Sequence, residues 1–189
     1  MQLISLWVED FKNLKDITIN FENQENLSIL IGNNGSGKSN ILEVLSGIFA
    51  DLYSHDGHIH SSYKLVYKIN DQLVEVSWEN TETRTSVHYK LNGEKTDKRY
   101  LTNHLLIPSR IITLYSGEDT RLYKNYYEEF TKRYIQNLST STQARIPLIY
   151  IDKKYWDIAL LVFAIKAYRG DTDSQSFLKK ELNINEVLG

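Results

Sequence analysis

Eight consecutive residues have the types and the spacing of a phosphate-binding loop. They read Gly32-Asn33-Asn34-Gly35-Ser36-Gly37-Lys38-Ser39 and match the pattern Gly-x-x-x-x-Gly-Lys-Ser/Thr in full. Glycines in this pattern let the backbone turn successive N–H groups toward one point, where they form a nest for an anion. A helix that begins at the end of the loop adds the positive end of its dipole at the same point. The sequence therefore predicts a site for the phosphates of a nucleoside triphosphate.

The last two residues of this loop have separate predicted roles. We expect the Lys38 amine to reach the β- and γ-phosphates, which makes it the catalytic candidate. The Ser39 hydroxyl is predicted to ligate Mg²⁺, a cation that prefers oxygen ligands. ATP and Mg²⁺ are the cofactors that this loop predicts.

The residues on either side of the loop have the pattern of a strand and a helix. Leu27–Ile31 is a short apolar run, as in a strand that is buried on both faces. After the loop, Ile41, Leu45, Ile48 and Leu52 recur at helical spacing. We expect residues 1–54 to form the core around the phosphate-binding loop.

Hydrolysis needs more than a phosphate-binding loop, because a second acidic residue must hold the metal and another group must position water. The best candidate for the acidic residue is Asp152, which follows the apolar run Leu148–Ile151 as in the acidic strand of many ATPases. Asp152 is also suited to cap the helix predicted from about Tyr155. We favour the cap and keep the metal-binding role as the alternative.

The rest of the chain predicts a mixed α/β fold. Residues 62–99 alternate apolar and polar side chains and contain the turn signal Asn92-Gly93, which indicates an inserted antiparallel β subdomain. Residues 100–189 are expected to mix strands and helices. The strands and helices expected outside the insertion cover Leu3–Val8, Ile17–Phe21, Arg110–Tyr115, Asp119–Leu138, Tyr155–Tyr168 and Ser174–Leu182.

Composition narrows the classes of function. The net charge of −2 and the pI of about 6.2 give no bulk electrostatic case for nucleic acid. The chain has no cysteine, which excludes disulfides and thiolate metal sites. The longest apolar run, Ile158–Ala167, is shorter than the roughly 20 residues that span a membrane and is predicted to be a buried helix. We expect no membrane contact and a cytoplasmic location.

Two segments of the chain carry a resemblance to a known family. Phe11-Lys12-Asn13-Leu14, the β-prone run that follows it, and the loop with its continuation Ser39-Asn40-Ile41-Leu42 resemble the opening of ABC-type ATPases of the SMC and RecF group. The resemblance implies that Asn40 belongs to the nucleotide site. It leaves two roles open for Lys12, which either approaches the nucleotide or lies on the solvated surface.

A second stretch, Ile107–Ile112 with Tyr115-Ser116-Gly117-Glu118, is similar to RecF-like ATPases of bacterial defence systems. In the wider group this strand ends in a Gln that helps to bind Mg²⁺. No Gln stands here, so the resemblance makes Glu118 a candidate metal ligand, with a plain turn and helix start as the alternative for Ser116 and Glu118.

The chain also departs from the family pattern. No signature motif or Asp-Glu pair is present, and Leu45-Ser46-Gly47 falls inside the predicted helix. The resemblance therefore implies an N-terminal lobe spanning 1–189 whose C-terminal half lies outside this sequence. It implies a nucleotide-dependent homodimer that works in DNA maintenance or phage defence, with DNA or an effector protein as partner.

Three alternatives remain open from the sequence. The first is a self-contained P-loop kinase or NTPase, in which Arg121, Lys132 and Arg133 would form a lid. The second is a non-catalytic module whose interactions depend on nucleotide. The third is a metal site formed by His55, His58 and His60, although we favour the interpretation of these residues as a polar loop.

Overall fold

The computed structural model describes residues 1–21, 27–54, 57–81, 84–115, 120–138, 145–153 and 155–185. It divides into two units. The first comprises Met1–Ile111 and Asp119–Ile149, and the second comprises Ile112–Glu118 and Tyr150–Gly189. The phosphate-binding loop belongs to the first unit.

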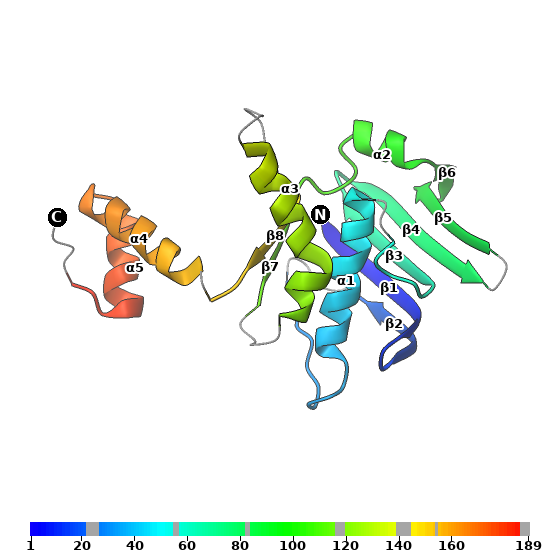
Figure 1. The fold of residues 1–189 in the computed structure, drawn as a ribbon, viewed down its shortest axis with the longest axis horizontal. Coiled ribbons are helices and arrows are strands. Elements are labelled where there is room, and N and C mark those ends of the chain that lie inside the picture. The colour runs from blue at the N-terminus through cyan, green and yellow to red at the C-terminus, as the bar shows by residue number, and fades with distance from the viewer. Residues whose placement is uncertain are drawn as a thin grey trace. The chain divides into compact units, whose positions relative to one another are not determined.

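The first unit is built on one antiparallel sheet of six strands in the order β2-β1-β3-β4-β5-β6 (Figure 1). The strands are β1 (Gln2–Phe11), β2 (Leu14–Asn20), β3 (Tyr63–Ile69), β4 (Gln72–Thr81), β5 (Arg84–Leu91) and β6 (Glu94–Thr96). The strands expected within 62–99 are therefore antiparallel, as predicted. They extend the sheet of β1 and β2 instead of forming a sheet of their own, because β3 pairs with the second edge of β1.

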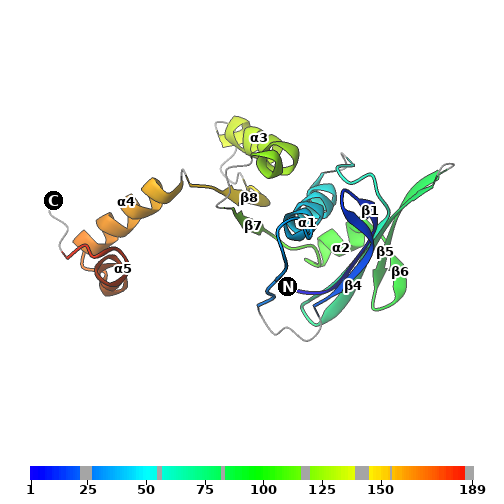
Figure 2. The ribbon, with the colours of Figure 1, turned by 90° about the horizontal axis from the view of Figure 1, so that it is seen from below.

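Helix α1 (Lys38–Tyr53) covers one face of this sheet (Figure 2). Its apolar positions Val44, Ile48 and Leu52 are at most 2% exposed. The ring of Phe49 meets that of Tyr67 on β3, with 6.3 Å between the ring centroids. Each fully buried aliphatic or aromatic side chain contributes roughly 1.5–3 kcal/mol relative to its exposed state. Of the helical pattern read from the sequence, Ile41, Ile48 and Leu52 are buried, Leu45 is half-buried, and Val44 is a buried position outside that pattern.

The strand predicted at Leu27–Ile31 is not formed. Leu27, Ile29 and Ile31 are 69%, 67% and 91% exposed, and the segment belongs to neither sheet of the described residues. The prediction is wrong because a strand buried on both faces needs a neighbour on each side and cover above and below. Within the described chain nothing supplies either.

Two further helices complete the first unit. The short α2 (Lys98–Asn103) begins at Asp97, whose side chain accepts from the Tyr100 N–H at 2.7 Å. The helix predicted over Asp119–Leu138 is present from Arg121; Asp119 itself lies outside the described residues. Its first part is a π-helical turn, η1 (Tyr123–Tyr127), which continues into α3 (Glu128–Leu138).

The described residues also form a small two-stranded sheet. It pairs β7 (Ile111–Leu114) with β8 (Leu148–Ile151). The Ile111 N–H donates to the Pro147 carbonyl and the Tyr115 N–H to the Ile151 carbonyl. Both bonds join residues 36 apart in the chain (147 − 111 and 151 − 115), and a constant offset identifies parallel strands.

The second unit ends in a pair of helices, α4 (Tyr155–Tyr168) and α5 (Thr172–Leu182), whose rings Phe163 and Phe177 stack at 4.6 Å. The expectation that Ile158–Ala167 is buried is wrong, since Ile158 and Leu161 are 59% and 60% exposed. The helix packs on α5 along one side, and its remaining apolar surface faces outward. No helix among the described residues is long and apolar enough to cross a membrane.

Candidate nucleotide-binding site

The phosphate-binding loop has the backbone conformation that an anion nest requires. Gly35 and Gly37 both have left-handed backbone angles, with φ of 85° and 97°. Gly37 is the N-cap of α1, and the first helical bond runs from the Ile41 N–H to its carbonyl at 3.0 Å. No side chain caps this end, and the first turn contains no acidic residue. The first N–H groups of α1 are therefore available to a negatively charged ligand.

Lys38 lies folded over the loop. Its amine donates to the carbonyls of Gly32 and Asn33 at 2.7 and 2.8 Å. A longer contact of 3.4 Å joins it to the Ser36 hydroxyl. These partners are neutral and exposed, so an incoming phosphate can displace them at small cost. The amine thus lies within the loop that it is predicted to serve.

An open hollow of about 220 Å³ lies at the loop. Ser39 is exposed there, so its hydroxyl is accessible to a cation held beside bound phosphates. The hollow is lined by Asn13, Asn34, Gly35, Gly37, Lys38, Ser39 and Asn40.

Asn13 is a site residue that the sequence pattern does not predict. It lies in the turn between β1 and β2, where its amide nitrogen donates to the Gly35 carbonyl at 2.7 Å. Its amide oxygen accepts from Asn40 at 2.6 Å. Asn13 therefore braces the loop at two points, and Asn40 acts on the loop through Asn13. Loop and turn are more than 20 residues apart in the chain, so no local spacing signals this contact.

The neighbouring Lys12 is exposed, which agrees with the surface alternative, and it is also ion-paired. Its amine pairs with the Glu43 carboxylate on α1 at 2.5 Å. The Glu43 side chain is only 6% exposed, whereas that of Lys12 is 35% exposed. Lys12 is thus a surface lysine held by an ion pair, and Glu43 is a second residue that the sequence pattern does not reveal.

The π-helical turn contacts the same side of α1. The hydroxyl of Tyr127 and that of Ser46 share a hydrogen bond of 2.7 Å in the interior. Tyr126 is 5% exposed; its burial, and secondarily the Glu43 carboxylate, raises the pKa of its hydroxyl. Two successive tyrosines therefore hold α1, and the Leu45-Ser46-Gly47 segment lies inside that helix as predicted.

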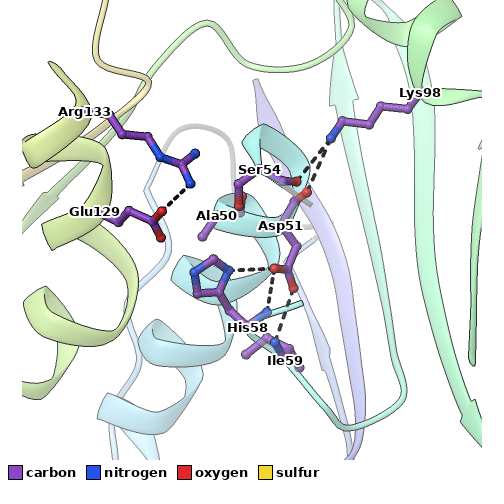
Figure 3. A network of polar contacts seen from close by, with 8 residues as sticks. All are labelled: Ala50, Asp51, Ser54, His58, Ile59, Lys98, Glu129 and Arg133. Atoms are coloured by element: carbon purple, nitrogen blue, oxygen red, sulfur yellow. Dashed lines mark hydrogen bonds and ion pairs between the residues drawn. The ribbon is translucent and has the colours of Figure 1, made fainter. Parts of the chain in front are cut away.

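Of the three clustered histidines, His58 belongs to a hydrogen-bond network around Asp51 (Figure 3). One carboxylate oxygen of Asp51 accepts from the His58 backbone N–H and lies 2.7 Å from its ring nitrogen Nδ1. Lys98 donates to the carbonyls of Asp51 and Ser54 from the other side, and its burial lowers its pKa. His55 lies outside the described residues, among which no group of three metal-ligating side chains occurs. The favoured interpretation as a polar loop agrees with this geometry.

The remaining candidates for metal binding and for a lid lie far from the loop in the sequence. Glu118 and Ser116 fall outside the described residues. Asp152 follows β8 in the second unit, and its carbonyl accepts from the Tyr155 N–H at 3.1 Å, at the turn into α4. The proposed lid cations Lys132 and Arg133 pair with Glu128 and Glu129 one turn earlier on α3.

A glycine nest at a helix start, with a lysine folded into it, defines a P-loop nucleotide-binding domain of mixed α/β structure. A protein-family model described as an AAA ATPase domain matches residues 1–187. The chain belongs to this family of P-loop ATPases.

A curated relative agrees with this assignment. Over 140 residues the chain is 24% identical to "Structural maintenance of chromosomes protein 3" of Caenorhabditis elegans. The alignment covers 67% of this chain but 11% of that protein. The resemblance to the SMC and RecF group seen in the sequence is thereby confirmed. What that much longer protein does as a whole is not carried over by a match of this extent.

Proposed function

We propose that this chain binds Mg²⁺-ATP at Gly32–Ser39 as the ATP-binding half of an ABC-type ATPase of the SMC and RecF kind. The observation that supports it most directly is the uncapped start of α1 beside two left-handed glycines. An uncapped helix start with no acidic residue in its first turn favours a polyanion. Family membership favours ATP as that polyanion.

Each residue of the loop has a role in this proposal. Backbone N–H groups of Gly32–Gly37, with that of Lys38, hold the phosphates. The Lys38 amine leaves the carbonyls of Gly32 and Asn33 for the β- and γ-phosphates. Ser39 supplies one oxygen ligand to Mg²⁺, and Asn40 with Asn13 keeps the loop in shape. Bound Mg²⁺-ATP supplies the cleavable phosphoanhydride and the charge that neutralises its oxygens.

The partners follow from the family. Heads of this kind close around two nucleotides, so we propose a nucleotide-dependent homodimer that is completed by a C-terminal half. DNA maintenance or phage defence in the cytoplasm is the proposed setting, with DNA or an effector protein as partner. Residues 1–54 would then be the P-loop core, and residues 62–99 the antiparallel addition. Residues 100–189 would link to the second half, and Glu118 within them is a candidate metal ligand.

The test is calorimetric titration of Mg²⁺-ATP and Mg²⁺-GTP into the chain and its Lys38→Ala variant, with phosphate release followed in parallel. We expect ATP binding that Lys38→Ala weakens at least about tenfold, equivalent to about 1.4 kcal/mol. Lys95→Ala, which removes an exposed lysine on β6, is the matched control and should bind as the parent does.

Binding without turnover would support an ATP-binding half. Turnover by this chain alone would replace the proposal with a self-contained kinase or NTPase. Equal affinity of the parent and Lys38→Ala would show that the loop is not the site.

A further inference from the structure

A buried carboxylate lies behind the phosphate-binding loop on the same helix. Glu43 is 5% exposed and lies one turn after Ser39 on α1. Its Oε2 atom pairs with the Lys12 amine at 2.5 Å, and the Tyr126 hydroxyl also interacts with the carboxylate. A charge buried in this way depends on its one cationic partner, because loss of that partner leaves the carboxylate uncompensated.

The partner of Glu43 has an unusual backbone. Lys12 is the first of two residues that join β1 to β2, and its φ is 56°, in the left-handed region. Glycine or asparagine usually occupies such a position, because other side chains crowd the backbone there. A residue persists in such a conformation where its surroundings hold it. The pairing of the Lys12 amine with Glu43 is such a restraint.

The same turn carries Asn13, which donates to the Gly35 carbonyl and accepts from Asn40. The turn also lies against Gly37, where an added Cβ would be 3.0 Å from Asn13 Oδ1. The contacts thus run in series from Glu43 to Lys12, along the turn to Asn13, and from Asn13 to the loop.

We propose that Glu43 is a positioning residue for the nucleotide site. Its buried charge holds Lys12, Lys12 fixes the turn, and the turn presses Asn13 against the loop, so that the nest is formed before a ligand arrives. Lys38 and Lys12, the two lysines near the loop, therefore have different roles. Lys38 has neutral, exposed partners that it can leave for a phosphate, whereas Lys12 stays with Glu43 because its departure would strand a buried charge.

The π-helical turn supports this arrangement. Ser46, on the same helix as Glu43, is hydrogen-bonded to Tyr127 of the π-helical turn. Tyr126 packs at Glu43 itself and is buried. The helix that carries Glu43 is therefore anchored beside Glu43, and the position of Lys12 is set relative to a fixed support.

The proposal concerns the site of the proposed function, and its test has one readout that needs no nucleotide. Hydrogen–deuterium exchange of the Asn34–Gly37 amides is measured in the nucleotide-free chain, and Mg²⁺-ATP affinity is measured by calorimetry. The variants are Glu43→Gln, Lys12→Met and their combination. Lys12→Arg keeps the charge. Glu75→Gln is the matched control, since Glu75 pairs with Lys90 at 2.7 Å on the sheet, away from the turn.

We expect Glu43→Gln and Lys12→Met each to speed exchange of the loop amides and to weaken Mg²⁺-ATP binding about tenfold, as loss of an outer-shell partner does at metal sites. The combination should be no worse than either change alone, because both remove one link. Lys12→Arg and Glu75→Gln should leave both readouts unchanged.

Unchanged exchange at the loop in Glu43→Gln or in Lys12→Met would overturn the proposal. Lys12 has a part-exposed side chain, so Lys12→Met decides the matter if Glu43→Gln does not fold. Should the parent chain bind no nucleotide, the proposed function fails while the exchange result still decides the role of Glu43. Additive losses in the combined variant would also overturn the positioning proposal, since they would mean that Glu43 and Lys12 have separate roles.

Discussion

Gly35 and Gly93 have nearly the same backbone conformation in different surroundings. Their φ angles are 85° and 88°, and an added Cβ at either would meet nothing within 4 Å. Alanine at each should therefore cost about 1–2 kcal/mol of stability through the left-handed backbone alone. Only Gly35→Ala should also weaken Mg²⁺-ATP binding, by about tenfold, because its relaxation moves N–H groups out of the nest.

Denaturant unfolding and calorimetry of the two variants measure both effects. Equal loss of ATP affinity in Gly93→Ala would show that general destabilisation, and not the shape of the loop, lowers binding. Gly93 lies in the hairpin between β5 and β6, so its stability cost calibrates that of Gly35.

Among the elements, α1 is fitted closely to what covers it. An added Cβ at Gly47 would lie 2.4 Å from Ile59 Cδ1 and 2.9 Å from Tyr126 Cε1. Alanine ordinarily stabilises a helix by about 1 kcal/mol over glycine. Overpacking of this size costs about 1–3 kcal/mol and should prevail, so Gly47→Ala should lose about 1 kcal/mol or more.

Ile59→Val, which deletes the nearest atom, tests that explanation. In a double-mutant cycle the two substitutions should couple favourably by at least about 0.5 kcal/mol, measured by chemical unfolding. Additive losses would mean that the clash with Ile59 is relieved some other way. A gain in stability from Gly47→Ala alone would contradict the packing described for α1.

The elements also show which features the sequence could predict. The P-loop, α1 and the antiparallel hairpins have local signals, since their spacing or turn residues fall within about ten residues. The failed strand at Leu27–Ile31 has a local signal as well, but a strand needs partners that its own sequence does not encode. The Lys12–Glu43 pair and the contact of Asn13 with Gly35 join residues 31 and 22 apart, which no periodicity reveals.

At the scale of the whole molecule, apolar surface is unevenly covered. Leu161 on α4 is 60% exposed, whereas Leu178 on α5 is 2% exposed. Leu178→Ala should cost about 2–5 kcal/mol, as large-to-small changes in a core do. Leu161→Ala should change stability by less than about 1 kcal/mol. Chemical unfolding followed by helical circular dichroism measures both.

A large loss for Leu161→Ala would instead support the buried helix that the sequence predicts. That result would require cover on α4 beyond α5. The two variants thus distinguish the partial burial of α4 among the described residues from the full burial that the apolar composition of Tyr155–Tyr168 predicts.

The position of β1 within the sheet bears on how the chain is made. Although β1 comes first in the chain, it is flanked by β2 and by β3, which begins at Tyr63. During synthesis the P-loop and α1 leave the ribosome before β3–β6, the strands that follow from Tyr63. The β1–β2 hairpin whose Asn13 braces the loop is therefore made before the loop, but β3, the second neighbour of β1, is made after it. We expect nucleotide to be captured only after translation has passed the sheet, so that binding reports on a completed lobe.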